Sequence, residues 1–463
     1  MHDLVIFGGR VVGEGGIARL DLGVSGERIA EIAPRIDSPA RRRIDATDLL
    51  VLPGGIDPHV HFGLPTKGTR SSDDPRTGTA AALFGGVTTV IDFTIQRPGQ
   101  RLVEGLKERL ADFEGNASCD YALHVNVTDF PARFEDGLRE ELERLAELGA
   151  ASLKVFTAYS KEGMSIPGGA LRVVMRMARE QGFRLLVHAE DDRLVAAAEE
   201  RLRAAGRWGA ADFPFSRPAE AEARAIEAVC EAAREAEAEV YFVHVSTAGG
   251  LDAIRKARER GASAIRLETC PQYLCLDDSR YAGPDGMQYL VAPPLRNLKD
   301  RQALLGALWM GDVDVVATDH CSFRKDQKDR SGAPFWDLPK GLPGVETRLP
   351  LLLELAARGG EIDRVVALTS TTPARIFGLY PRKGCLAVGS DADVVLLDPE
   401  ATRTVSAGSL RMATDFSPYE GMKVRGRIRK VLLRGTVVVD GDALVEAAVG
   451  RYLRRRPSPA ADL

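Results

Sequence analysis

Residues 49–61 read LLVLPGGIDPHVH, an apolar run that ends in prolines and glycines and is followed by two histidines. The run at 49–52 predicts a buried strand, and the turn-forming residues after it predict where the strand ends. Side chains two positions apart in an extended segment point to the same side, so His59 and His61 project together with Asp57 beside them. Two imidazoles on one face are typical of a zinc-like metal site, although two ordinary histidines at a strand end produce the same pattern.

The composition is that of a soluble globular protein. The chain has 463 residues, of which 44% are hydrophobic and 28% charged, with a net charge of -4. That size predicts one large domain and a smaller one. The charge argues against a nucleic-acid partner, and no apolar run is long enough for a membrane helix. The first residues lack the features of a signal peptide, and the six cysteines are sparse. We therefore expect a cytoplasmic protein with free thiols, among which Cys321 is structural.

Between about residues 53 and 380, short apolar runs alternate with longer amphipathic segments rich in Ala, Glu and Arg. This alternation predicts an α/β fold with a parallel sheet, and eight such units predict a (β/α)8 TIM-like barrel. The expected strands are 49–52, 87–93, 121–127, 152–156, 184–187, 240–243, 264–267 and 313–317. The expected helices between them include 77–84, 138–148, 169–181, 218–236 and 250–260.

The two ends of the chain share a different pattern. Short strands with alternating apolar and polar residues, separated by turn signals, are predicted in residues 1–52 and 381–450. Because chain ends often lie close together, we expect them to form one small composite β-sandwich domain beside a catalytic barrel at 53–380. The tail at 451–463 combines three consecutive arginines with prolines, which predicts a loosely ordered, solvated segment.

Five of the seven histidines fall at the ends of predicted strands. They are His59, His61, His188, His244 and His320, and Asp319 lies beside the last. In a (β/α)8 barrel the carboxyl ends of the strands share one rim, so these side chains should converge there. A core histidine with satisfied hydrogen bonds is the simpler explanation for any one of them, but not for all together. His2 and His124 do not share this position and receive no role.

Lys154 lies inside the apolar strand predicted at 152–156. Burial of an ammonium group is costly and should lower its pKa. The residue could be a snorkelling or ion-paired lysine. It could instead be a neutral amine that captures CO₂, because the resulting carbamate is an anion with two oxygens and can bridge two cations.

These motifs make the chain resemble the dihydropyrimidinase and hydantoinase family, the cyclic-amide branch of the amidohydrolase superfamily. The resemblance covers most of the chain and is carried by residues 54–61, 73–74, 85–89, 152–159, 293–296, 318–323 and 419–424. Together the motifs are specific for the branch and less specific for the substrate.

The resemblance implies a centre of two divalent metal ions, usually Zn²⁺. The ligands would be His59, His61 and Asp319 for one ion, and His188 and His244 for the other. Lys154, carboxylated to N6-carboxylysine, and a hydroxide would bridge the two ions. Asp319 would take a proton from the bridging water and deliver it to the leaving nitrogen, and Tyr159 would stabilise the tetrahedral oxyanion. For Tyr159 alone, an aromatic residue on the rim is the competing interpretation.

The implied reaction opens 5-substituted hydantoins or dihydropyrimidines to N-carbamoyl amino acids without ATP. The sequence departs from the family pattern at Ala292, where members often carry Ser, and at Lys340, where many carry Asn. In the family these positions contact the ring amide largely through main-chain atoms, so the changed side chains need not abolish binding. Ring size and preferred substituent stay open. Leu64 and Phe156 are expected on the apolar wall that faces the substituent. Core packing is the other interpretation of Phe156.

Two other functions remain open at this point. Allantoinase-type or dihydroorotase-type ring opening would use the same centre. Dihydroorotate carries a ring carboxylate, so an enzyme that opens it needs a cation on the cavity wall. The matching motifs offer no obvious arginine for this role, and Lys340 is the candidate cation. A non-catalytic dihydropyrimidinase-like scaffold would have lost metal ligands, whereas all of them are present here. The resemblance also implies a homotetramer or homodimer and a small cyclic ureide or imide as the bound partner.

Overall fold

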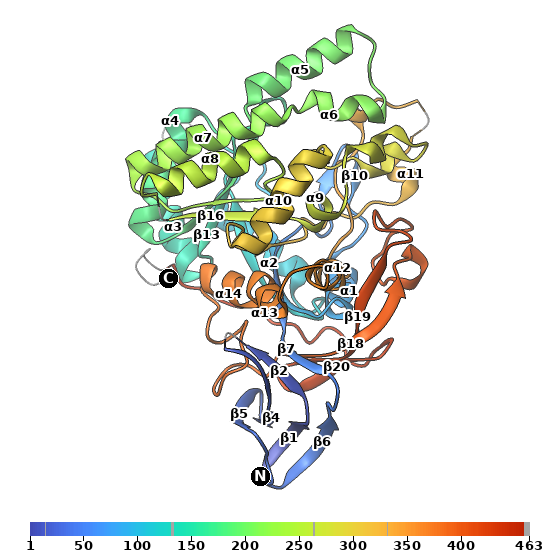
Figure 1. The fold of residues 1–463 in the computed structure, drawn as a ribbon. Coiled ribbons are helices and arrows are strands. Elements are labelled where there is room, and N and C mark those ends of the chain that lie inside the picture. Colours follow the sequence, from blue (N-terminus) through green and yellow to red (C-terminus); the bar gives the residue numbers. More distant parts are fainter. Residues whose placement is uncertain (14, 131–133, 263, 331, 458–463) are drawn as a thin grey trace.

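The computed structural model describes residues 1–13, 15–130, 134–262, 264–330 and 332–457. Its centre is a curled sheet of eight parallel strands in the order β17-β16-β15-β14-β13-β12-β11-β8, with helices on its outer side (Figure 1). The strands are β8 (Gly55–Val60), β11 (Val87–Phe93), β12 (Asp120–Asn126), β13 (Ser152–Phe156), β14 (Arg184–His188), β15 (Val240–Phe242), β16 (Ile265–Thr269) and β17 (Val315–Val316). A parallel bridge between Val60 and His320 links the ends of the first and last strands.

Amphipathic helices connect these strands. The longer ones are α1 (Pro75–Phe84), α2 (Leu102–Phe113), α3 (Phe134–Glu147), α4 (Gly168–Gln181), α5 (Asp192–Ala204), α7 (Ala219–Ala236), α8 (Ala248–Glu259), α10 (Leu298–Met310) and α12 (Arg348–Ala356). Local sequence explains where they begin. The Asp74 carboxylate accepts the Thr77 N–H at 2.8 Å and caps α1, and Asn297 caps α10 in the same way. The expected βα alternation is therefore present, with boundaries shifted by a few residues.

The first expected strand was assigned to the wrong sheet. The run at 49–52 becomes β7 (Leu50–Pro53), which pairs with β2 (Arg10–Gly13) and β18 (Val394–Thr404) instead of the eight-stranded sheet. The chain then bends at Gly54, where an added Cβ would lie 2.1 Å from the Thr88 side chain. The parallel sheet begins only afterwards, with β8. An apolar run predicts a buried strand but does not say which sheet buries it.

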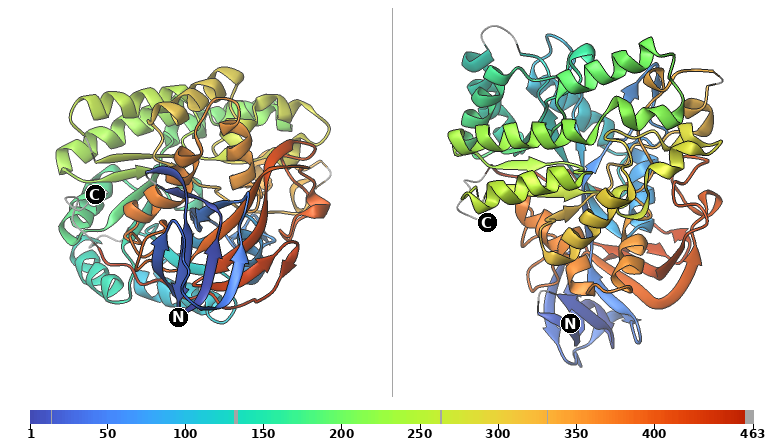
Figure 2. Two further views of the ribbon diagram at one scale, coloured as in Figure 1. Left: turned by 60° about the horizontal axis from the view of Figure 1, so that its bottom comes forward. Right: turned by 45° about the horizontal axis from the view of Figure 1, so that its top comes forward.

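Strands from both ends of the chain lie together below the eight-stranded sheet (Figures 1 and 2). One sheet has the order β5-β4-β1-β6, and the other has the order β21-β20-β19-β18-β7-β2-β3. The strands of these two sheets not yet given are β1 (His2–Phe7), β3 (Gly16–Arg19), β4 (Asp21–Ser25), β5 (Arg28–Ala33), β6 (Ala40–Asp45), β19 (Lys423–Leu433), β20 (Thr436–Asp440) and β21 (Ala443–Leu444). Leu4 and Leu22 of the first sheet share a buried apolar cluster with Leu396 and Leu432 of the second, so the two sheets pack face to face.

The tail after residue 450 packs against the eight-stranded sheet, so the prediction of a loosely ordered segment was wrong for residues 451–457. The Tyr121 N–H donates to the Arg451 carbonyl at 3.0 Å, and the Leu453 N–H donates to the Tyr121 carbonyl at 2.7 Å. Arg455 is 1% exposed and donates to the Ser152 hydroxyl at 2.9 Å. Arg455 thus finds buried acceptors that the sequence does not reveal. Residues 458–463 lie outside the described residues.

Within the described ranges, every helix is too short or too polar to cross a lipid bilayer.

Candidate metal centre

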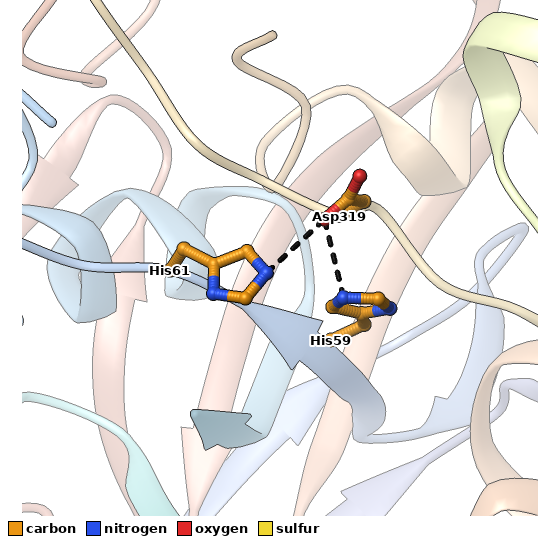
Figure 3. Close-up of side chains that lie close together, drawn as sticks. All are labelled: His59, His61 and Asp319. Carbon is orange, nitrogen blue, oxygen red and sulfur yellow. Dashed lines mark ion pairs between the residues drawn. The ribbon is translucent and has the colours of Figure 1, made fainter. Parts of the chain in front are cut away.

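His59, His61 and Asp319 form a compact group at the carboxyl ends of the parallel strands (Figure 3). His59 lies in β8, His61 follows that strand, and Asp319 follows β17. The Asp319 Oδ1 atom is 3.2 Å from His59 Nε2 and 3.3 Å from His61 Nε2. One carboxylate oxygen thus faces two imidazole nitrogens, and the three candidate ligand atoms lie within 4.8 Å of one another. This is a donor set that suits a divalent cation.

A second pair of imidazoles lies beside this group. His188 ends β14 and His244 follows β15, and His188 Nδ1 is 2.9 Å from His244 Nε2. Two nitrogen ligands of one tetrahedral zinc, each at about 2.05 Å, are about 3.3 Å apart. The rings of His59 and His244 have centroids 5.6 Å apart, so the two groups are close enough to share a bridging ligand.

Lys154 is 2% exposed in the middle of β13. Its Nζ atom lies 5.5 Å from the centroid of the Phe93 ring and 5.2 Å from that of Phe156. Burial lowers the pKa of the amine to about 7, although Glu268 and Asp319 nearby favour its charged form. A large share of the amine is therefore neutral near pH 7, which is the form that can react with CO₂.

Three of the candidate histidines and Asp319 are in the protonation states that metal binding requires. Burial lowers the pKa of His59, His188 and His244, so their imidazoles are neutral at pH 7. Burial alone would raise the pKa of Asp319, but His59 and His61 outweigh it and hold that pKa below its usual value. Asp319 is therefore a carboxylate at neutral pH.

Glu268, near the end of β16, contacts both His59 and the main chain of His244 and so fixes their positions. Its Oε1 atom lies 2.7 Å from His59 Nδ1 and accepts the His244 backbone N–H at 2.9 Å. The Tyr241 hydroxyl donates to Oε2 at 2.8 Å. Sequence reasoning missed Glu268, although it directly follows the strand predicted at 264–267 and the strand-end rule could have found it.

Glu190 and Arg217 form a second supporting pair that the sequence analysis did not identify. Glu190 Oε2 is 2.7 Å from His188 Nε2, which leaves Nδ1 of that ring directed at His244. Arg217 donates from Nε to Glu190 Oε1 at 3.0 Å, and its guanidinium lies 4.7 Å from the Tyr159 ring centroid. Burial raises the pKa of Tyr159, so its hydroxyl keeps its proton and can donate a hydrogen bond.

The residues assigned to metal binding, catalysis or substrate contact from the sequence line one cavity of about 440 Å³. They are His59, His61, Leu64, Lys154, Phe156, Tyr159, His188, His244, Ala292, Asp319 and Lys340. A larger hollow of about 540 Å³ lies beside Trp309 and Arg364, but none of these candidates lines it. The volume of the first cavity is in the range of small-molecule sites.

The backbone is strained at this site. Tyr159, His244 and Asp319 have φ values of 73°, 41° and 50°. Positive φ is uncommon outside glycine and clusters at functional sites, where the surrounding structure enforces it. Nothing in the sequence at these positions predicts this conformation.

Two residues expected near the metal ligands have other contacts. His320 lies 3.1 Å from Asp73 through Nε2, and its Nδ1 accepts the Gly344 N–H at 3.1 Å. It is fully buried and lies outside the cavity lining, so its expected convergence with the other histidines was wrong. Asp57 accepts the Thr318 N–H at 3.1 Å and so fixes the segment that carries Asp319.

Cys321 is also part of the cavity lining. Burial raises the pKa of its thiol, which makes it a poor nucleophile at neutral pH.

The chain is similar to known proteins over nearly its whole length. Residues 50–438 match the sequence profile of the amidohydrolase family. The chain is 38% identical over 459 residues to the D-hydantoinase of Ralstonia pickettii, covering 98% of this chain and 99% of that protein. It is 38% identical over 461 residues to a D-phenylhydantoinase of Escherichia coli, covering 98% of each. The crystal structure of dihydropyrimidinase from Brevibacillus agri matches with a TM-score of 0.94 at 37% identity, over 98% of both chains.

Proposed function

The chain belongs to the amidohydrolase family, and from this premise we propose that it hydrolyses a cyclic amide bond, opening 5-substituted hydantoins or dihydropyrimidines to N-carbamoyl amino acids. Its relatives over nearly the whole length carry the names D-hydantoinase and D-phenylhydantoinase. The reaction needs no ATP, because water is the second reactant.

One observation carries the proposal. Lys154, a buried amine with a pKa lowered to about 7 by burial, lines the same cavity as the four candidate histidine ligands. A cationic lysine there would repel metal ions, whereas a carbamate formed with CO₂ would bridge them. The residues present therefore fit a two-ion centre, with His59, His61 and Asp319 on one side and His188 and His244 on the other. Zinc fits this nitrogen and oxygen donor set best.

Divalent ions at this centre would lower the pKa of a bound water and polarise the scissile carbonyl. Asp319 is a carboxylate at neutral pH and would accept the proton of that water. The water oxygen bonds to the carbonyl carbon, the ring C–N bond breaks, and Asp319 returns the proton to the leaving nitrogen. Tyr159 keeps its hydroxyl proton and would donate a hydrogen bond to the oxyanion that forms on the way.

The substrate lies, in this proposal, between the metal ligands and the rest of the cavity. Leu64 and Phe156 would face the ring substituent, while the main chain at Ala292 and Lys340 would contact the ring amide. Apolar side chains such as Met164 also line the cavity, which supports binding of an apolar ring substituent.

The finer architecture is part of the same proposal. The bridge between Val60 and His320 supports closure of the eight strands into a (β/α)8 barrel at residues 53–380. The two face-to-face sheets support a composite β-sandwich domain of residues 1–52 and 381–450. We further propose a homotetramer or homodimer that works in the cytoplasm, without a nucleic-acid or membrane partner.

The test is ring opening by one zinc-loaded preparation on dihydrouracil, hydantoin, both enantiomers of 5-phenylhydantoin, allantoin and dihydroorotate. The proposal expects turnover of a hydantoin or of dihydrouracil, with loss of activity in Lys154→Met. Circular dichroism and metal content of the variant separate a lost centre from a lost fold. Turnover of allantoin or dihydroorotate alone would assign a different ring to the same chemistry. Full activity of Lys154→Met would exclude the carbamate bridge.

A further inference from the structure

The cavity carries several cationic side chains beyond Lys154, and nearly all of them are already paired. Four of these cations have carboxylate partners: Lys67 with Glu162 at 3.5 Å, Lys161 with Glu199 at 3.5 Å, Arg203 with Glu199 at 2.8 Å, and Arg217 with Glu190. Lys340 differs from them. Among the described residues it has neither a carboxylate within ion-pair distance nor a hydrogen-bond partner.

Lys340 is half-buried on the cavity wall, and its Nζ atom lies 6.0 Å from the ring centroid of Phe213. Burial lowers the pKa of Lys340 to about 7, and the nearby cationic side chains of Arg217 and Lys67 contribute to this lowering. A cation in such surroundings costs stability unless something neutralises it. Lys340 lines the cavity, so an anion that neutralises it can bind there.

The main chain at Lys340 is held firmly. The adjacent Gly341 N–H donates to the Leu290 carbonyl at 2.9 Å. The buried Lys328 donates from Nζ to the carbonyls of Leu290 and Gly341 at 2.6 and 2.5 Å. An added Cβ at Gly341 would meet the Cys321 carbonyl at 2.6 Å, so this segment packs directly against the chain that follows Asp319. Lys340 is therefore presented on a rigid rim, next to the candidate metal centre.

We propose that the preferred substrate is a cyclic ureide whose ring substituent carries a carboxylate, and that Lys340 binds this carboxylate. The inference rests on the proposed function and specifies its substrate class. A carboxylate supplies the partner that Lys340 lacks, and a charge-assisted hydrogen bond is stronger than one between neutral groups. The neighbouring Phe213 ring offers a carboxylate no hydrogen bond, so discrimination between acid and neutral substituents falls to Lys340.

The test compares two substrates of equal shape, 5-carboxymethylhydantoin and its amide, 5-carbamoylmethylhydantoin, on the zinc-loaded enzyme. We expect kcat/KM to favour the acid by about 10–100-fold, with the difference mainly in KM. Lys340→Met should reduce this ratio to one or below, and Lys340→Arg should restore part of it. Lys161→Met is the matched control, because it removes a cation of the same cavity that already has a partner, and it should preserve the ratio.

A second measurement needs no variant. The product of the acid substrate, N-carbamoyl aspartate, should inhibit the wild-type enzyme about tenfold more strongly than N-carbamoyl asparagine. Equal use of acid and amide by the wild-type enzyme, or an unchanged ratio in Lys340→Met, would overturn the role of Lys340 while leaving the proposed function intact. Failure to open any hydantoin or dihydrouracil would overturn both.

Discussion

Glu268→Gln should weaken metal binding although Glu268 is not itself a candidate ligand. The carboxylate is fully buried and accepts hydrogen bonds from His59 Nδ1 at 2.7 Å and from the His244 backbone at 2.9 Å. It therefore orients one ring and one ligand-bearing segment, and it fixes the tautomer in which His59 Nε2 faces Asp319. Burial raises the pKa of Glu268 to about 8, so the substitution mainly removes an acceptor. Glutamine has nearly the same shape, but its amide presents only one acceptor oxygen.

The size of the effect follows from these contacts. Loss of an outer partner of a metal-bound histidine typically costs 10–100-fold in metal affinity, which corresponds to about 1.4–2.7 kcal/mol. Tyr241→Phe is the matched control. It removes the hydroxyl that donates to Glu268 Oε2 and leaves the contacts to His59 and His244 in place. We expect it to change metal affinity less than about fivefold, since one hydrogen bond contributes about 1 kcal/mol net.

The assay is competition for zinc between the protein and a chelator of known affinity, with wild type, Glu268→Gln and Tyr241→Phe measured side by side. Thermal unfolding in the presence of excess chelator checks that both variants fold. If Glu268→Gln binds zinc as tightly as the wild type, the reasoning about ring orientation is refuted. Equal losses in both variants would point instead to general loosening of the site.

Three further perturbations follow from the structure. Arg217→Met should lower kcat/KM by about 10–100-fold, because Arg217 both pairs with Glu190 and stacks on Tyr159; an unchanged value would remove it from the site. Burial raises the pKa of Glu346 from 4.5 to about 7. The native state therefore keeps the carboxyl proton to a higher pH than the unfolded chain does. The free energy of unfolding should fall as pH rises from about 4.5 to 7. Urea unfolding of Glu346→Gln at pH 5 and pH 8 should show this fall reduced by up to about 3 kcal/mol, and an identical pH profile would contradict the assignment. Lys383→Met should destabilise the protein by about 3–5 kcal/mol in urea unfolding, because it leaves Asp120 and two further buried carboxylates without their central cation; a loss below 1 kcal/mol would contradict this.

The sequence predicted most of the fold where hydrophobic patterning alone decides it. The strands at 87–93 and 152–156 have the expected bounds, because each is an apolar run between turn signals. The assignment of residues 49–52 failed, because periodicity reports burial and not the identity of the neighbouring strand. The prediction of a loosely ordered tail failed at 451–457 for a related reason. Arg454 and Arg455 donate hydrogen bonds to backbone carbonyls that are distant in the chain.

The candidate site was predictable to the extent that its residues lie at strand ends. His59, Lys154 and His188 line one cavity as expected, because parallel strands bring their carboxyl ends to one edge. His320 has the same position in the sequence, yet its ring turns away because Asp73 and two backbone N–H groups offer it hydrogen bonds. Glu190 supports the site through contacts with Arg217 that form only when distant segments fold together.

The central claim is that this chain holds two divalent ions, bridged through Lys154, and uses them to open a cyclic ureide. The most direct measurement is the ring-opening rate of metal-free protein as zinc is added back in the presence of bicarbonate, on a hydantoin that the wild-type enzyme uses. We expect the rate to rise until two zinc ions are bound per chain, and to stay near zero throughout in Lys154→Met. A rate that reaches its maximum with one ion, or that does not depend on added metal, would contradict the account.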